Sequence, residues 1–183
     1  IKWEVLYYAE QLKPTEVEML YPEYVQLVFD LRQLLSDILH IGVPEWEGKT
    51  GGYFCLADAG TGNPLFEPAL IGTVPEEKKE KYLAFCQEKA KRLANHPEHE
   101  ASWESRNEEA NEWGGALRIG TLIFSFSGLP EWGDEALMLI LAEVHFSTFG
   151  DLDIMLEATH RIVSKTRNPY WQELRGKLFG RIG

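Results

Sequence analysis

Cysteine is scarce in this sequence, since Cys55 and Cys86 are the only two among 183 residues. Small secreted domains that depend on disulfides use several cysteine pairs, so this count excludes a disulfide scaffold. Both cysteines stand among apolar neighbours, and free cysteines are among the most buried residue types. We therefore expect two buried free thiols.

A concentrated basic region is also missing. The formal net charge is -11 and the pI is about 4.9. The densest run of lysine and arginine lies in residues 78–92, where glutamates are interspersed. Binding to nucleic acid requires a basic surface that displaces counterions from the phosphates. We predict that nucleic acid is not a partner, and we interpret residues 78–92 as a solvated helix face.

Long apolar runs are lacking as well. A membrane-spanning helix needs about 20 consecutive apolar residues, and no run in the sequence approaches that length. The first 13 residues lack the charged-then-apolar pattern and the small-residue cleavage site of a secretory signal. The sequence therefore predicts a cytoplasmic protein with no membrane partner.

Hydrophobic residues are plentiful, at 44% of the chain, and aromatic residues make up 12%. A chain of this length and composition can bury the core of one domain with an appended terminal element. From Tyr24 to Ile38 the apolar residues recur at helical spacing, and Gly42 and Pro44 end the pattern. Residues 1–9 fit either a short strand or a loose helical turn.

Two hairpins alternate with helices in the next part of the chain. Residues 53–58 and 64–74 predict the first hairpin. Its second strand is expected at a sheet edge or bulged near Pro68, because proline cannot donate a hydrogen bond to the sheet. A helix is predicted directly after Pro75, and residues 95–113 are expected to form a long loop.

The last third of the chain predicts a second strand pair over residues 114–127, with a turn near Gly120. Pro130 then opens a helix that is apolar nearly all round and is therefore expected to be buried. The order helix, hairpin, helix, hairpin, helix, helical tail predicts an α+β protein with a single antiparallel β-sheet of about four to five strands, flanked by helices. We divide the chain into a domain over residues 1–150 and a C-terminal helical extension over residues 151–183, packed on the same domain or on a second subunit.

Four short motifs are similar to those of one known family. They are DAGTG at residues 58–62, GALR at 115–118, SG at 127–128 and DE at 134–135. Over residues 22–147 the chain resembles the GlcG/HbpS-like group, often labelled haem-degrading domain proteins. The resemblance implies a profilin-like sandwich of an antiparallel sheet and helices, frequent homo-oligomers, and binding of haem or small ligands in some members. The long loop and the C-terminal extension depart from the family pattern.

The corner between the second hairpin and the apolar helix, residues 125–135, is the candidate site. Residues 124–128 are FSFSG, which lacks the first glycine of the G-x-S-x-G nucleophile elbow, and no spacing ties a histidine base to Ser127. Backbone N–H groups at the start of a buried helix instead favour an anion, with Arg118 of the neighbouring strand expected within reach. The candidate ligand-binding residues are Arg118, Ser125, Ser127, Gly128, Asp134 and Glu135.

Three histidines raise the possibility of a metal or haem site. His96 and His99 have the spacing of a metal-binding pair, but Pro97 separates them and no third ligand stands at a recognisable distance. An exposed polar turn is the simpler interpretation. His145, at the end of the apolar helix, is a candidate axial ligand of haem, with a structural role as the alternative. We predict no metal and no catalytic residue, and the cofactor is left open with haem as one option.

The sequence best fits a non-catalytic small-molecule-binding or assembly protein that forms homo-oligomers. Part of the 151–183 extension is expected to contact a second copy. One alternative is an enzyme that acts on a small anionic substrate at the corner. A second alternative is a protein-interaction module, in which an acidic surface and the loop tryptophans Trp103 and Trp113 contact a partner. Those tryptophans can instead tuck under the loop and hold it down.

Overall fold

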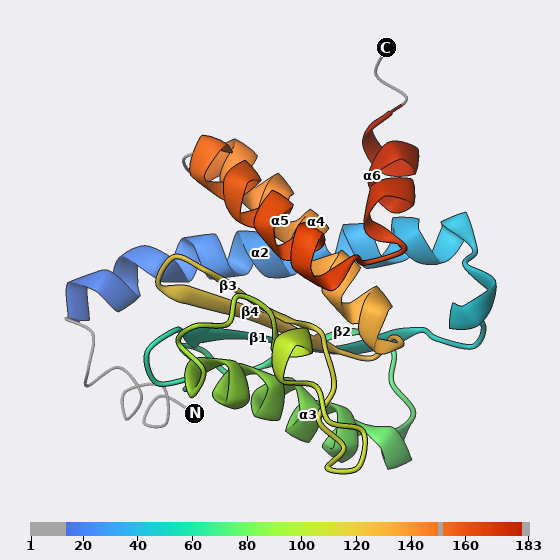
Figure 1. Ribbon diagram of the computed structural model, residues 1–183, viewed down its shortest axis with the longest axis horizontal. Helices are drawn as coiled ribbons and strands as arrows, with labels where there is room; N and C mark the ends of the chain where they lie inside the picture. The colour runs from blue at the N-terminus through green and yellow to red at the C-terminus, as the bar shows by residue number, and fades with distance from the viewer. Residues whose placement is uncertain (1–13, 150–151, 181–183) are drawn as a thin grey trace.

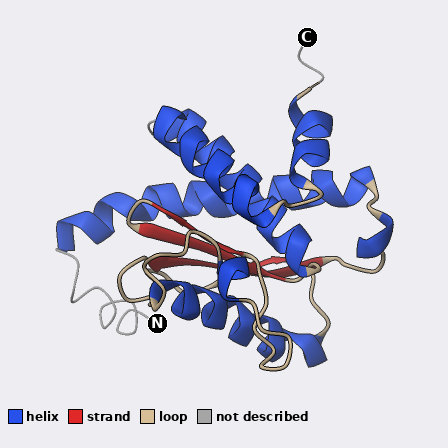
Figure 2. Cartoon of the chain, in the orientation of Figure 1, coloured by secondary structure: helices blue, strands red, loops and turns tan. Residues whose placement is uncertain are grey.

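The computed structural model describes residues 14–149 and 152–180, which form five α-helices, two short 3-10 helices and four strands (Figures 1 and 2). The predicted α+β class is confirmed. In chain order the elements are α2 (Pro14–Ile41), η2 (Pro44–Trp46), β1 (Gly51–Asp58), β2 (Ala69–Gly72), α3 (Glu76–Ala94), η3 (Ser102–Ser105), β3 (Ala116–Ile119), β4 (Leu122–Ser127), α4 (Glu131–Phe149), α5 (Leu152–Thr166) and α6 (Trp171–Phe179).

The four strands form one antiparallel sheet in the order β2-β1-β4-β3. Both predicted hairpins are present, β1 with β2 and β3 with β4, and they join through the central pair of β1 and β4. In that central pair Cys55 lies opposite Ser125, and Ala57 lies opposite Ile123. Strand β2 is at an edge, as expected for a segment that contains prolines.

Strand β2 is shorter than the predicted span of residues 64–74. Only Ala69–Gly72 pairs continuously with β1, and Pro64 forms an isolated bridge with Ala57. Pro64 and Pro68 lack the N–H group that a continuous ladder requires. The prolines therefore limit the edge strand to its last four residues.

The outer side of β3, at the other edge of the sheet, is covered by the chain just before η3. Ala101 forms an isolated bridge with Leu117, and the backbone N–H of Arg118 donates to the carbonyl of Glu100 at 2.8 Å. The predicted loop over residues 95–113 therefore contains ordered short elements and pairs with the sheet.

Helix α3 covers one face of the sheet, and α2 and α4 cover the other (Figure 1). Successive side chains of a strand point to opposite faces, so each central strand contributes to two layers. Phe54, Phe124 and Phe126 belong to the larger core beneath α2 and α4. Cys55 and Ile123 belong to a smaller core beneath α3. The side chains of β4 therefore alternate between the two cores.

The two cysteines are buried and free, as predicted. The Cys86 thiol lies 3.1 Å from the carbonyl of Tyr53 and 3.3 Å from that of Ser125. In return the Ser125 hydroxyl donates to the carbonyl of Cys86 at 2.7 Å. Burial raises the pKa of the Cys86 thiol. These contacts attach the middle of α3 to the two central strands.

Helix α2 contains the predicted helical segment from Tyr24 to Ile38 but begins earlier, at Pro14, and continues through Pro22 to Ile41. Residues 136–142 of α4 are all buried, in agreement with its apolar composition. No helix in the described ranges is both long enough and apolar enough to cross a membrane. The expectation for residues 1–9 and the expected boundary between residues 150 and 151 fall outside the described residues.

The C-terminal extension packs on the same domain. Helix α5 lies against α4, and α6 contacts both α4 and α2. Ile162 and Leu174 are buried in the larger core. These two side chains therefore contribute to the hydrophobic core of this chain, while the expected contact of the extension with a second copy stays a prediction.

Candidate functional site

The corner between β4 and α4 is closed by the side chain of Asp134. Its Oδ1 atom accepts hydrogen bonds from the backbone N–H groups of Gly128, at 3.2 Å, and Leu129, at 2.8 Å. The sequence predicted that an external anion would use the free N–H groups at this helix start. The carboxylate of Asp134 already takes that position, so a ligand must be held by other groups.

Glycine is required at the end of β4 because two backbones pass very close to each other there. A Cβ atom on Gly128 would lie 2.4 Å from the carbonyl oxygen of Gly51, and one on Gly52 would lie 2.3 Å from that of Ser127. No side chain fits at such distances. The corner motif Ser127–Gly128 is thus explained by close packing of β1 against the end of β4.

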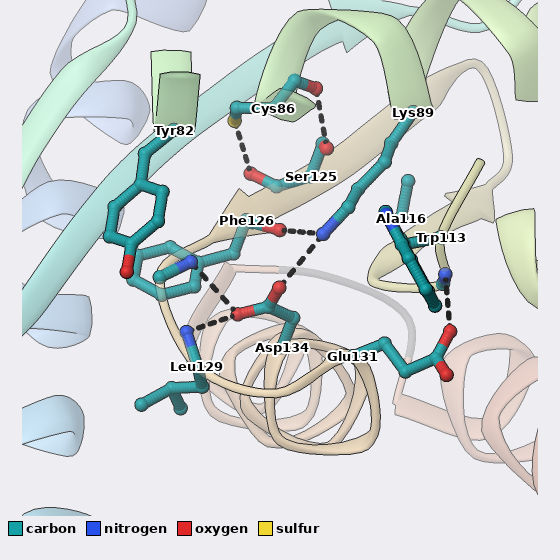
Figure 3. A network of polar contacts seen from close by, with 12 residues as sticks. Tyr82, Cys86, Lys89, Trp113, Ala116, Ser125, Phe126, Leu129, Glu131 and Asp134 are labelled. Carbon is teal, nitrogen blue, oxygen red and sulfur yellow. Dashed lines mark hydrogen bonds and ion pairs between the residues drawn. The ribbon is translucent and has the colours of Figure 1, made fainter. Parts of the chain in front are cut away.

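Lys89 of α3 reaches across the sheet edge to Asp134 (Figure 3). Its Nζ atom lies 2.8 Å from Oδ2 of Asp134 and donates to the carbonyl of Phe126 at 2.9 Å. The two side chains are only 3% and 2% exposed. Gly115 lies against the pair with a φ of 116°, and a Cβ atom there would come within 2.9 Å of Nζ.

Burial sets the protonation behaviour of this pair. It raises the pKa of Asp134 from 3.8 to about 6, while the charge of Lys89 and the two backbone N–H groups act in the opposite direction. Asp134 is therefore ionised at neutral pH. A buried carboxylate with a hydrogen-bonded cation beside it is a stable arrangement only while both partners are present.

An open pocket of about 550 Å³ lies beside the buried ion pair. Ligand sites in proteins typically have volumes of about 300–1,000 Å³. The walls of the pocket beside Lys89 come from α3, the loop before β1, the end of the 95–113 loop and the β4–α4 corner. The lining residues are Lys49, Lys78, Lys81, Tyr82, Phe85, Lys89, Trp113, Ser127, Gly128, Leu129, Pro130, Glu131, Trp132 and Asp134.

The pocket carries an excess of positive charge that is unusual for so acidic a protein. Within the described part of the chain, the side chains of Lys49, Lys78 and Lys81 form no ion pair. Lys49 Nζ lies 3.5 Å from the Tyr82 hydroxyl, and Lys81 Nζ lies 5.5 Å from the centre of the Phe85 ring. Within the described residues, three lysines without an ion pair therefore line the pocket, and the ammonium groups of Lys49 and Lys81 lie beside aromatic rings.

Glu131, the second acidic residue of the lining besides Asp134, is paired with Arg106. Glu131 receives two hydrogen bonds of 2.9 Å from Arg106. The Arg106 guanidinium lies over the rings of Trp103, at 4.9 Å, and Trp113, at 5.3 Å, and Trp103 stacks on Trp132. The structure thus supports the interpretation in which the loop tryptophans hold the loop down, here against α4.

Five of the six site residues predicted from the sequence fall into two groups: three line the pocket, and two are buried outside it. Ser127, Gly128 and Asp134 line the pocket. Ser125 is fully buried and bonds to the backbone of α3. Glu135 is fully buried and faces Asn168 at the connection between α5 and α6, where Oε1 accepts a hydrogen bond of 3.1 Å. Ser125 and Glu135 are therefore structural residues outside the pocket.

Arg118 was expected within reach of the β4–α4 corner, but it lies away from Gly128. Strand β3 does pair with β4, but the register places Arg118 opposite Ile123. Gly128 is five residues further along, which corresponds to roughly 16 Å of extended strand. Arg118 instead donates hydrogen bonds to four backbone carbonyls, those of Ala59, Leu93, His96 and His99.

Lys78, Lys81 and Lys89 were missed because residues 78–92 were interpreted as a solvated helix face. A signal does exist in the sequence. Lys78, Lys81, Tyr82, Phe85 and Lys89 recur at spacings of three and four residues, which places them on one side of a helix. A stripe that combines lysines with aromatic residues differs from an ordinary charged helix face. Lys49 is distant in sequence, and its position beside them depends on the tertiary fold.

The pocket offers little to haem iron. Its lining contains no histidine, cysteine or methionine, and the hydroxyl of Tyr82, its one residue of a haem-ligating type, lies 3.5 Å from Lys49 Nζ. His145, the candidate ligand, is buried in α4 with its ring 6.5 Å from that of Phe124. Burial lowers the pKa of His145. We therefore place no haem at either position.

Comparisons with known proteins add no assignment to these residues. No protein-family model matches the chain, and neither the curated proteins nor the solved structures provide a match. The resemblance to the GlcG/HbpS-like group stays an expectation from the sequence. The functional interpretation therefore depends on the pocket itself.

Proposed function

We propose that this protein binds a small anionic molecule that has an aromatic or other apolar body, and that it does so without catalysing a reaction. The observation that carries the proposal is a set of three lysines, Lys49, Lys78 and Lys81, that form no ion pair with the described residues and surround a pocket with aromatic walls. Lysine ammonium groups attract a carboxylate or phosphate as point charges. Tyr82 and Phe85 supply apolar surface for the rest of the ligand.

A binding role is favoured over an enzymatic one by the chemistry of the lining. Ser127 has no histidine beside it among the lining residues, so a serine nucleophile would lack its usual base. Lys89 and Asp134 are bound to each other and to backbone groups. Neither is free to accept or release a proton for a substrate without breaking a buried ion pair.

The proposal is tested by calorimetric titration with three probes that separate charge from apolar contact: phenyl phosphate, inorganic phosphate and phenol. We expect phenyl phosphate to bind most tightly, because it uses both the lysines and the rings. The double variant Lys78→Gln/Lys81→Gln should weaken its binding by roughly tenfold, since each partly exposed charge contact contributes about 0.5–1 kcal/mol.

Two further variants make the test specific. Phe85→Ala should weaken phenyl phosphate while leaving inorganic phosphate unchanged, because only the apolar contact is removed. Lys177→Gln, in an exposed pair with Glu173 on α6, serves as the matched control and should bind like the parent protein. Equal affinity of the parent and Lys78→Gln/Lys81→Gln for phenyl phosphate, or no binding of any probe by the parent, would refute the proposal.

An assembly role is also supported by a specific observation. Three large apolar side chains of α2 point outward, Tyr21 at 57%, Val25 at 50% and Phe29 at 65% exposure. They are four residues apart and therefore lie on one side of the helix. We propose that this α2 stripe contacts the same stripe of a second copy, because a twofold interface brings one surface against itself.

A further inference from the structure

The turn that follows α3 brings two histidines together. The backbone N–H of His99 donates to the carbonyl of His96 at 3.0 Å, which closes a four-residue turn. Pro97 occupies the second position, where its fixed φ favours this geometry. Pro97, which separates the two histidines in the sequence, therefore favours the turn that places them side by side. Their rings are stacked, with centroids 4.8 Å apart.

Arg118 holds this turn in place from the sheet. Its Nη2 atom donates to the carbonyls of Leu93, at 2.5 Å, and His96, at 3.3 Å, and its Nε atom donates to that of His99, at 3.1 Å. A planar guanidinium that bonds to several carbonyls at once restricts their relative positions. The backbone that carries both imidazoles is thus positioned by a residue outside the turn.

Glu98 supplies the third donor that the sequence did not reveal. Its Oε1 atom lies 3.2 Å from Nδ1 of His96 and 3.5 Å from Nε2 of His99. The donor atoms of His96, Glu98 and His99 all lie within 4.8 Å of one another. In a tetrahedral zinc site with bonds of about 2.0–2.1 Å, neighbouring donor atoms are about 3.4 Å apart. The two distances to the carboxylate already match that spacing.

We propose that His96, Glu98 and His99 form a binding site for a divalent transition metal, with Zn²⁺ as the best-fitting ion. Two imidazoles and one carboxylate are ligands that Zn²⁺ accepts, and three protein ligands leave a fourth position for water. The side chains of His96 and His99 are 41% and 20% exposed, so a metal ion can reach them from solvent.

The charges around the turn are compatible with this assignment. Glu98 brings one negative charge to the donor set. Glu100, the next acidic residue, is already paired with Arg161 at 2.8 Å and Lys165 at 3.0 Å. Arg161 and Lys165 are therefore engaged by Glu100, and Arg118 is directed at backbone carbonyls.

The site is tested on untagged protein that has been freed of metal with a chelator. Calorimetric titration with ZnCl₂ should show saturable binding of one ion per chain. Co²⁺, which substitutes for Zn²⁺ and absorbs visible light strongly only in low-coordinate sites, should give a visible absorption band that ZnCl₂ removes. Neither measurement depends on the pocket beside Lys89, so this proposal stands or falls independently of the proposed anion binding.

Substitutions in the turn identify the ligands. His96→Ala, His99→Ala and Glu98→Gln should each weaken Zn²⁺ binding by roughly tenfold or more and abolish the Co²⁺ band. His40→Ala is the matched control, since His40 is an exposed histidine at the end of α2, and it should bind as the parent does. Circular dichroism checks that each variant is folded. The proposal is overturned if the parent shows no saturable binding, or if His96→Ala and His99→Ala bind Zn²⁺ as tightly as the parent.

Discussion

Lys89 and Asp134 form the most deeply buried of the ion pairs in the described residues, with both side chains almost fully removed from solvent. Elsewhere at least one partner is substantially exposed, as in the Lys177–Glu173 pair on α6. Exposed pairs contribute little, at about 0–1 kcal/mol. In a buried pair, the removal of one partner leaves an uncompensated charge in a medium of low polarity.

We predict that Asp134→Asn lowers the free energy of unfolding by about 3–5 kcal/mol at pH 7. The asparagine can still accept hydrogen bonds from Gly128 and Leu129, but its amide no longer balances the charge of Lys89. Urea unfolding followed by circular dichroism measures the effect. The double variant Lys89→Met/Asp134→Asn should recover part of the loss, because no buried charge then remains.

Lys177→Gln provides the comparison for an exposed pair and should change the free energy of unfolding by less than about 1 kcal/mol. If Asp134→Asn is as mild as Lys177→Gln, the Lys89–Asp134 pair does not contribute to stability in the way that its burial implies. If Lys89→Met/Asp134→Asn lowers the free energy of unfolding as much as Asp134→Asn does, the packing of the two side chains matters more than their charges.

Among the helices, α4 and the α5–α6 connection are joined by Glu135 and Asn168. The Asn168 side-chain amide donates to the carbonyl of Trp132, at 2.9 Å, and to Glu135. Its carbonyl oxygen accepts from the backbone N–H groups of Tyr170 and Trp171, at 3.0 and 3.1 Å, and thus caps α6. The buried side chain of Asn168 therefore fixes the start of α6 relative to α4.

We predict that this joint makes stability depend on pH. Burial raises the pKa of Glu135 from 4.5 to about 7, so between these values the folded protein binds more protons than the unfolded chain. The free energy of unfolding contributed by Glu135 is therefore fully present below pH 4.5 and is lost as the pH rises towards 7 and above. The full loss corresponds to about 3 kcal/mol.

Urea unfolding of the parent and of Glu135→Gln at pH 5 and pH 8 isolates this contribution, since other titrating groups are common to both proteins. Glutamine keeps the acceptor for Asn168 but cannot ionise. Its stability relative to the parent should therefore increase from pH 5 to pH 8. An unchanged difference between the two proteins would show that Glu135 titrates normally. Glu173→Gln, at an exposed position on α6, controls for the loss of a surface carboxylate.

The helices and hairpins were predictable because their periodicity and their glycine and proline boundaries are local properties of the sequence. The apolar positions from Tyr24 to Ile38, and the start of α3 after Pro75, needed no tertiary information. The position of Arg118 could have been predicted from the expected turn near Gly120, because a two-residue turn fixes the register of a hairpin. Gly120 and Thr121 connect β3 to β4 and pair Ile119 with Leu122, which places Arg118 near the turn and away from Gly128.

The candidate site was predictable only in part, because its residues come from segments that are far apart in the sequence. Gly128 and Asp134 were identified from the strand-to-helix corner, and both do line the pocket. The partner of Asp134 is 45 residues away in sequence, and Lys49 comes from a separate loop. Charge pairing across such separations is determined by the tertiary fold. From its composition alone, the segment around Lys89 was therefore interpreted as a solvated helix face.

For the whole molecule, the net charge of -11 makes the lysine pocket a local exception. At physiological ionic strength the range of charge interactions is about 8 Å. A small anion inside the pocket is therefore influenced mainly by the lysines that surround it. The net negative charge of the chain is expected to repel large polyanions, which is the physical basis of the prediction that nucleic acid is not a partner.

The expected homo-oligomer is predicted to form through the α2 stripe. Phe29→Glu should convert it to a monomer, because a charge at the most exposed of the three apolar positions cannot be buried against a second copy without a large penalty. Native mass spectrometry measures the mass and would also retain a bound ligand. The fold should be unaffected, since Phe29 is 65% exposed.

Gln172→Glu introduces the same charge at an exposed position of α6 and should leave the mass unchanged. A parent protein that is already monomeric, or a Phe29→Glu variant with the same mass as the parent, would exclude the stripe as an interface. A mass change in Gln172→Glu alone would point to the C-terminal extension as the contact between copies.

The two borders of the sheet also bear on aggregation. An exposed strand with unpaired N–H and C=O groups is a template on which another chain can add a strand. Here β3 is covered along its outer side by residues 100–101, and prolines limit β2 to four residues. Neither border offers a long template. We infer that partly unfolded or crowded copies are protected from joining edge to edge into continuous intermolecular sheets, so that self-association is restricted to the helical surface.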